Sequence, residues 1–127
     1  MHEAPKKIEF HRRSQELEVI FSQQNYRFSA EFLRVHSPSA EVKGHGPGQE
    51  VLQHGKQHVA ITDIEANGHY AIRITFDDGH DSGIYSWAYL AELGQDQESL
   101  WQCYLDKLAE ANLNRDPDTQ VVKIFDM

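Results

Sequence analysis

The stretch AIRITFDDGHDSGIYSW, residues 71–87, determines the fold that we expect for this chain. Its first half alternates, so that Ile72, Ile74 and Phe76 share one face of a strand while Arg73 lies on the other. This period of two is typical of an antiparallel strand with one buried face. The stretch therefore predicts a strand, a turn, a second strand and the first residues of a helix.

The turn is predicted at Asp78-Gly79, because both residue types tolerate the positive φ of a type I′ hairpin. This loop fixes the pairs across the hairpin: Ile72 with Tyr85 and Ile74 with Gly83 on the core face, and Arg73 with Ile84, Thr75 with Ser82 and Asp77 with His80 on the other. We interpret Asp77 and His80 as a surface pair that sets the register. A general base or a metal ligand is the alternative interpretation of this pair.

Composition places the chain among ordinary soluble domains. It has 127 residues, of which 39% are hydrophobic and 25% charged, which predicts one domain over residues 1–127 with a single core. No apolar run approaches the roughly 20 residues of a membrane span, and residues 1–10 lack the apolar core of a signal peptide. We expect a cytoplasmic protein without a membrane partner.

Charge and cysteine content exclude further classes. The 20 acidic and 12 basic residues give a net charge of −8, which opposes binding to phosphate backbones and makes nucleic acid an unlikely partner. The single cysteine, Cys103, excludes an intrachain disulfide and a multi-cysteine metal site within one chain.

Outside the central stretch the pattern predicts an α+β fold, in which antiparallel β hairpins pack against a C-terminal helix. Alternating apolar residues predict strands near residues 8–10, 17–21, 26–28, 49–52 and 59–64. Short helices are expected at 30–35, capped by Ser29, and at 87–93, capped by Ser86 and ended by Gly94. In the tail, residues 116–127, the segment 121–125 could pair as an edge strand or dock on a partner.

The longest predicted helix covers residues 97–113, with Asp96 as its cap. Its apolar side chains recur every three or four residues, which is the spacing of a face that covers a sheet. The stripe consists of Trp101, Tyr104, Leu105, Leu108 and Asn112, and Cys103 points away from it. We therefore expect a solvent-exposed, chemically idle thiol.

Residues 37–49 hold three glycines and two prolines and are expected to form a loop. The glycine-rich part, residues 44–48, lacks the lysine spacing of a phosphate-binding loop, so phosphate binding is not favoured. Binding residues often lie on loops that a rigid scaffold holds, which favours some other contact here.

Four motifs resemble one known family. They are LRVHSPSAEV at residues 33–42, GHGPGQ at 44–49, FDDGH at 76–80 and GIYSW at 83–87. Over about residues 17–115 the chain resembles the γ-butyrobetaine hydroxylase-like N-terminal domain family, long catalogued as a domain of unknown function. In the hydroxylases this domain precedes a jelly-roll domain that holds iron and 2-oxoglutarate. The chain has no such catalytic domain, so we do not expect hydroxylase activity.

The resemblance also implies where a metal would lie. In the hydroxylases the small domain is similar to a zinc module with a Cys-Pro-Cys-x-x-Cys run and a downstream histidine. The matching positions here are Ser37, Ser39, Val42 and His80. Hydroxyl groups and an alkyl group do not replace thiolates on zinc, so this site is expected to be empty. Related domains are fused to P-loop iron–sulfur carriers, which implies a role near iron–sulfur cluster handling.

Three functional hypotheses follow. The favoured one is an accessory module that binds a protein partner through an exposed surface made of His36, Ser37, Pro38, Gly44, His45, Gly46, Pro47, Gly48, Gln49, Asp77, Asp78 and His80. A metal-binding protein would use His80 with His36, His45 and either Asp77 or Asp81. An enzyme would use Asp77 and His80 as an acid–base pair beside Ser37, Ser39 or Ser82. The cofactor, the partner and the oligomeric state stay open.

Overall fold

The computed structural model describes residues 3–119 and 122. These residues form six strands and four helices, which confirms the α+β prediction. In chain order the elements are β1 (Lys7–His11), β2 (Glu16–Ile20), β3 (Asn25–Ser29), α1 (Ala30–Val35), α2 (Ala40–Lys43), β4 (Ile61–Asn67), β5 (Ala71–Phe76), β6 (Gly83–Ser86), α3 (Trp87–Gln95) and α4 (Gln97–Glu110).

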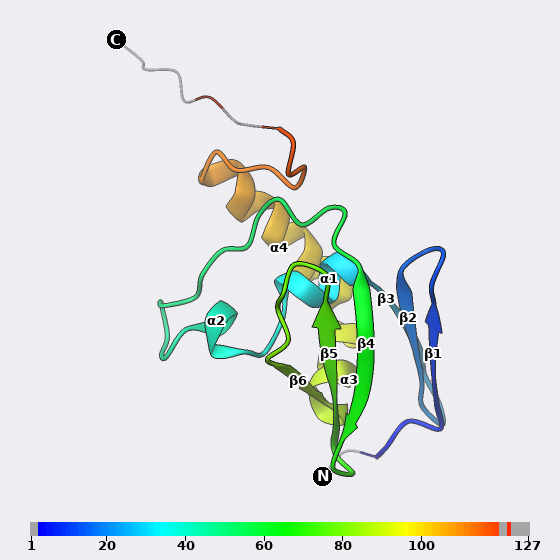
Figure 1. The fold of residues 1–127 in the computed structure, drawn as a ribbon. Coiled ribbons are helices and arrows are strands. Elements are labelled where there is room, and N and C mark those ends of the chain that lie inside the picture. Colours follow the sequence, from blue (N-terminus) through cyan, green and yellow to red (C-terminus); the bar gives the residue numbers. More distant parts are fainter. Residues whose placement is uncertain (1–2, 120–121, 123–127) are drawn as a thin grey trace.

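The strands form two antiparallel three-stranded sheets, ordered β1-β2-β3 and β4-β5-β6. Helix α3 contacts β3 of the first sheet, β6 of the second and the neighbouring α4. In Figure 1, α3 lies behind the β4-β5-β6 sheet, α4 runs upward from the same region, and α2 lies to the left of α1. The largest side chains without solvent exposure come from both sheets and from α1 and α3, and include Leu17, Phe28, Leu33, Ile74, Tyr85 and Leu90. One core therefore joins the two sheets.

The register of the central hairpin is confirmed along its ladder. Ile72 pairs with Tyr85 and Ile74 with Gly83. At the tip the pairing shifts by one residue, because the Phe76 amide donates to the His80 carbonyl at 2.9 Å. Gly79 has a φ of 90°, whereas Asp78 does not adopt a positive φ. The predicted two-residue type I′ turn is therefore wrong, because the loop between Phe76 and His80 has three residues.

Serine caps begin two helices as predicted. The Phe32 amide donates to Ser29 Oγ at 3.0 Å, and the Tyr89 amide donates to Ser86 Oγ at 3.1 Å. These bonds satisfy amides that the first helical turn leaves unpaired. Asp96 occupies the predicted N-cap position of α4, but its side chain makes no capping hydrogen bond.

Gly94 lies inside α3 and does not end it. A Cβ atom at this position would lie 2.3 Å from the Tyr26 ring, so the missing side chain lets β3 pack closely on α3. The helix ends after Gln95, one residue beyond this contact. Helix α4 ends at Glu110 and not at residue 113. Asn112, two residues beyond this end, has a positive φ of 56°.

Three further expectations differ from the structure. Residues 49–52 form no strand, and the strand expected at 59–64 begins at residue 61 and runs to 67. The segment expected to be a loop, residues 37–49, contains the short helix α2, capped by Ser39. The possible edge strand at 121–125 lies outside the described residues except for Val122. Within the described part of the chain, no helix has the length and apolar character needed to cross a bilayer.

Candidate functional site: a buried histidine and an adjacent groove

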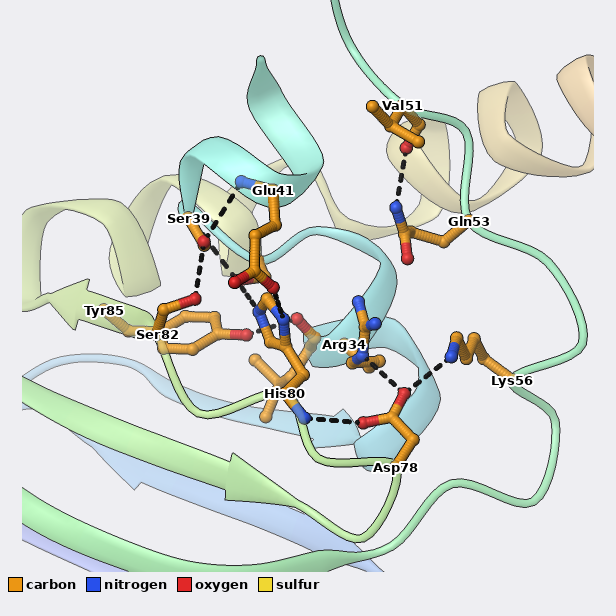
Figure 2. Close-up of polar contacts among 12 residues, drawn as sticks. Arg34, Ser39, Glu41, Val51, Gln53, Lys56, Asp78, His80, Ser82 and Tyr85 are labelled. Carbon is orange, nitrogen blue, oxygen red and sulfur yellow. Dashed lines mark hydrogen bonds and ion pairs between the residues drawn. The ribbon is translucent and has the colours of Figure 1, made fainter. Parts of the chain in front are cut away.

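The His80 ring is enclosed at the tip of the central hairpin, with a side-chain exposure of 1%. Its Nε2 atom lies 2.8 Å from Ser37 Oγ, and its Nδ1 atom lies 2.9 Å from Glu41 Oε2. Figure 2 shows Glu41 reaching from α2 onto the ring, while most of its own side chain stays exposed. Both ring nitrogens are thus occupied by side chains about 40 residues earlier in the chain.

The predicted pairing of Asp77 with His80 is wrong. Asp77 Oδ1 accepts a hydrogen bond from the Ala60 amide at 3.0 Å, so this carboxylate turns toward the segment before β4. The one-residue shift at the hairpin tip removes Asp77 from the position opposite His80. Glu41 supplies the carboxylate on the imidazole instead.

Asp78 is the electrostatic centre of the hairpin tip. Its Oδ2 atom accepts from Arg34 Nε at 2.8 Å and from Lys56 Nζ at 2.6 Å, and its Oδ1 atom accepts from the His80 amide at 3.1 Å. Figure 2 shows Arg34 and Lys56 converging on this carboxylate. Burial alone would raise the pKa of Asp78, but the bonds from Lys56, His80 and Arg34 outweigh it and lower the pKa to about 2.

Two serines connect this tip to the start of α2. Ser39 Oγ lies 2.7 Å from Ser82 Oγ and accepts from the Glu41 amide at 3.2 Å, which caps α2. Ser37 Oγ accepts from the Ser39 amide at 3.3 Å. A Cβ atom on Gly83 would lie 2.7 Å from Ser37 Oγ, so glycine is what allows Ser37 to sit against β6.

The residues present do not fit the zinc site that the resemblance implies. Ser37 and Ser39 supply hydroxyl groups that hydrogen-bond to His80 and Ser82, and Val42 supplies a buried alkyl group. Structural zinc sites use thiolates and imidazoles. In the part of the chain that the structure describes, no three His, Cys, Asp or Glu side chains are grouped to hold a metal ion. The proposed set of His36, His45 and His80 is therefore not assembled.

The order Ser37–His80–Glu41 matches the hydroxyl, imidazole and carboxylate of nucleophilic hydrolases. A nucleophile must be reachable by its substrate, however, and Ser37 has an exposure of 0%. The bonds instead tie the hairpin tip to the segment between α1 and α2. This geometry is that of a structural cluster.

An open groove of about 460 Å³ lies beside this cluster. One wall comes from the end of α1, from α2 and from residues 50–53, and the other comes from α3 and α4. Its apolar lining consists of Val35, Val42, Val51, Leu52, Leu93 and Leu100. Charged side chains also line it, namely Lys43, Glu50, Glu92, Asp96 and Lys107. Apolar walls with a few polar groups are the usual construction of a binding site.

His36 lines the groove with its imidazole in a defined protonation state. Burial lowers its pKa, and the nearby charges of Lys107 and Lys43 lower it further, so the imidazole is neutral near pH 7. Its Nδ1 atom lies 2.9 Å from the Phe32 carbonyl oxygen, which places the proton on Nδ1. Its Nε2 atom has no hydrogen-bond partner among residues 3–119 and 122, and therefore offers a lone pair.

Two tyrosines fix the walls of the groove. Tyr89 Oη donates to the His36 carbonyl at 2.6 Å, and Tyr104 Oη donates to the Gln53 carbonyl at 2.9 Å. Burial is the main cause that raises the pKa of each tyrosine to about 12. These bonds join α3 to the end of α1 and α4 to the 50–53 segment, so they fix the two walls relative to each other.

The predicted interaction surface is divided in the structure. Its exposed members are His45, Pro47, Gly48, Gln49, Asp77 and Asp78, while His36, Pro38, Gly44 and Gly46 are half-buried. Ser37 and His80 are buried beneath it. The sequence reasoning missed Glu41, Arg34 and Lys56. Only the first has a local signal, because a glutamate two residues after Ser39 suits the first turn of a helix.

A family model described as "Gamma-butyrobetaine hydroxylase-like, N-terminal" matches residues 8–91. The chain belongs to this family. The match includes the hairpin, the His80 cluster and the groove wall made by α1, α2 and residues 50–53, but not α4. No curated protein matches the chain.

Three solved structures are similar to this chain. Two solution NMR structures have 49% and 39% sequence identity and TM-scores of 0.81 and 0.78. They cover 95% and 99% of this chain, and it covers 96% and 95% of theirs. A crystal structure of a DUF971 protein of unknown function from Acidithiobacillus ferrooxidans has 32% identity and a TM-score of 0.56, covering 71% of this chain and 91% of its own.

Proposed function

We propose that this chain is a small accessory module that binds a segment of a partner protein in the groove between α2 and α4. The observation that carries the proposal is the groove itself, whose apolar walls are joined by the Tyr89 and Tyr104 hydrogen bonds. A preformed site lowers the entropy lost on binding. The neighbouring segment, residues 47–50, is exposed and can extend the contact.

A binding role suits the chemistry better than catalysis does. The hydroxyl–imidazole–carboxylate cluster is closed to substrate at Ser37, and the groove carries no paired acid and base. Val51 stands on the groove with 54% of its surface exposed. An exposed apolar side chain beside an apolar channel is typical of a contact surface for another protein.

We further propose that the partner acts in iron–sulfur cluster handling in the cytoplasm. The support is the resemblance to domains fused to iron–sulfur carriers. The chain has one cysteine, and Cys103 lies exposed on the groove. One thiolate does not hold a cluster by itself, so the cluster would belong to the partner.

Affinity capture with matched variants tests the proposal. Val51→Asp places a charge on the groove, whereas Ile84→Asp places one on the outer face of β6, where the exposure of 46% is similar. We expect Ile84→Asp to retain the partner and Val51→Asp to lose it, and the purified partner to show the same difference in Kd. Equal binding by the two variants would refute the groove as the site.

A further inference from the structure

We infer that the groove selects a partner segment with one acidic residue among apolar ones, and that its carboxylate binds between Lys43 and Lys107 beside His36. The inference rests on the proposed function and specifies the chemistry of the bound segment. It makes His36, Lys43 and Lys107 the residues that determine specificity.

Among the described residues, neither lysine has a carboxylate within ion-pair distance. Ion pairs in the described part of the chain include Lys7 and Lys56, but neither Lys43 nor Lys107. Lys43 Nζ rests over the Tyr89 ring, 4.3 Å from its centre, and so stays on the groove wall. Although the chain has a net charge of −8, these two lysines place cations on the groove that a bound carboxylate could meet.

Both lysines lie near one imidazole. Lys43 comes from α2 and Lys107 from α4, on opposite walls, and each charge acts on His36 at the end of α1. A carboxylate between the two walls would meet both cations. The imidazole beside them adds no negative charge, and its open Nε2 atom can take up a proton when a carboxylate is bound.

Three carboxylates limit how acidic the bound segment can be. Glu50 lies on the 50–53 wall, while Glu92 and Asp96 lie at the end of α3. None of them pairs with Lys43 or Lys107 within 4.0 Å among the described residues. They would repel a run of acidic residues. A single acidic residue flanked by apolar ones satisfies both the lysines and the apolar lining.

The arrangement also gives binding a pH dependence. The groups that face His36 are Phe32 on α1, Lys43 on α2, Tyr89 on α3, and Tyr104 and Lys107 on α4. A bound carboxylate would offset the two positive charges, so the pKa of His36 is higher in the complex than in the free protein. Because binding then takes up a proton, affinity increases as pH falls through the pKa of His36 in the complex.

Three peptides that differ at one residue test the inference: acetyl-Leu-Asp-Leu-Phe-amide and its Asn and Lys counterparts. Amide shifts of the ¹⁵N-labelled protein would locate each peptide and give its Kd. We expect the Asp peptide to bind in the groove about fivefold more tightly than the Asn peptide, and the Lys peptide more weakly than both. The imidazole signals of His36 should titrate at higher pH with the Asp peptide bound.

Matched lysine variants complete the test. Lys43→Gln and Lys107→Gln should each remove the advantage of the Asp peptide, while Lys7→Gln on β1, where the side chain is 63% exposed, should keep it. Equal affinity of the three peptides would overturn the inference and leave the proposed function standing. If no peptide shifts the groove amides, the inference is also overturned, and the Val51→Asp comparison alone decides the proposed function.

Discussion

The Nε2 atom of His80 lies 2.8 Å from the Oγ atom of Ser37, and these two residues are 43 positions apart in the sequence. Both are buried, and Glu41 closes the other side of the ring. The contact fastens the hairpin tip to the segment that leads into α2. Because α2 forms part of the groove wall, the buried cluster positions the surface that we propose for binding.

His80→Ala should lower the free energy of unfolding by about 2–4 kcal/mol, because it leaves a cavity and removes the partner of the buried Ser37 hydroxyl. Glu41→Gln is the matched control, since that side chain is 68% exposed and its loss should change stability by less than about 1 kcal/mol. Urea unfolding of the two variants measures both values. Similar effects of the two substitutions would contradict a structural role for the buried ring.

Gly83→Ala should destabilise the protein by about 1–3 kcal/mol, because the new methyl group would meet Ser37 Oγ at 2.7 Å and the Tyr85 ring at 3.0 Å. In the double variant Ser37→Ala/Gly83→Ala the first clash is gone. The loss of stability should therefore be smaller than the sum of the two single losses. A double-mutant cycle by chemical denaturation checks this, and strict additivity would place Ser37 away from β6.

Asp78 should make stability sensitive to acid. Its pKa is lowered from 3.8 to about 2, so its contribution is complete above pH 3.8 and is lost as pH falls through about 2. The stability difference between the wild type and Asp78→Asn should therefore shrink by about 1–2 kcal/mol between pH 4 and pH 2. Urea unfolding at several pH values measures it. Asp81→Asn, which removes an exposed carboxylate from the same hairpin, is the comparison variant.

Restoring thiolates tests whether Ser37, Ser39 and Val42 occupy the positions of zinc ligands. The triple variant Ser37→Cys/Ser39→Cys/Val42→Cys would offer three thiolates beside His80 and should bind one Zn²⁺ per chain. Elemental analysis and the absorbance of the Co²⁺ form would show this. Adding His80→Ala should weaken metal binding by at least tenfold, in line with the loss of one ligand. A triple variant that stays free of metal would contradict the correspondence of these positions.

The local pattern was sufficient to predict the hairpin ladder and two helix starts. The alternation of apolar and polar residues indicated that Ile72 and Ile74 lie on the core face. The caps at Ser29 and Ser86 could be predicted because capping depends on only a few neighbouring residues. The prediction for the hairpin tip was wrong for two reasons. The side chain of Asp78 is held by Arg34 and Lys56, which come from distant segments. The turn also needs a positive φ only at Gly79.

The site itself depends on contacts that no local pattern reports. Glu41 reaches His80 from α2, a helix of four residues inside a segment rich in glycine and proline. The groove is built from the end of α1, α2, the 50–53 segment, α3 and α4, so its existence follows from tertiary packing alone. Residue identity indicated His36 and His80, but only the fold separates the groove residue from the buried one.

The most direct measurement is amide shift mapping of the ¹⁵N-labelled protein with the partner recovered by affinity capture. We expect the largest changes on the groove walls, at Val51, Leu52 and Cys103, with little change at the exposed residues Ile84 on β6 and Tyr70 in the turn before β5. The largest changes at Ile84 and Tyr70, with the groove amides unmoved, would contradict it.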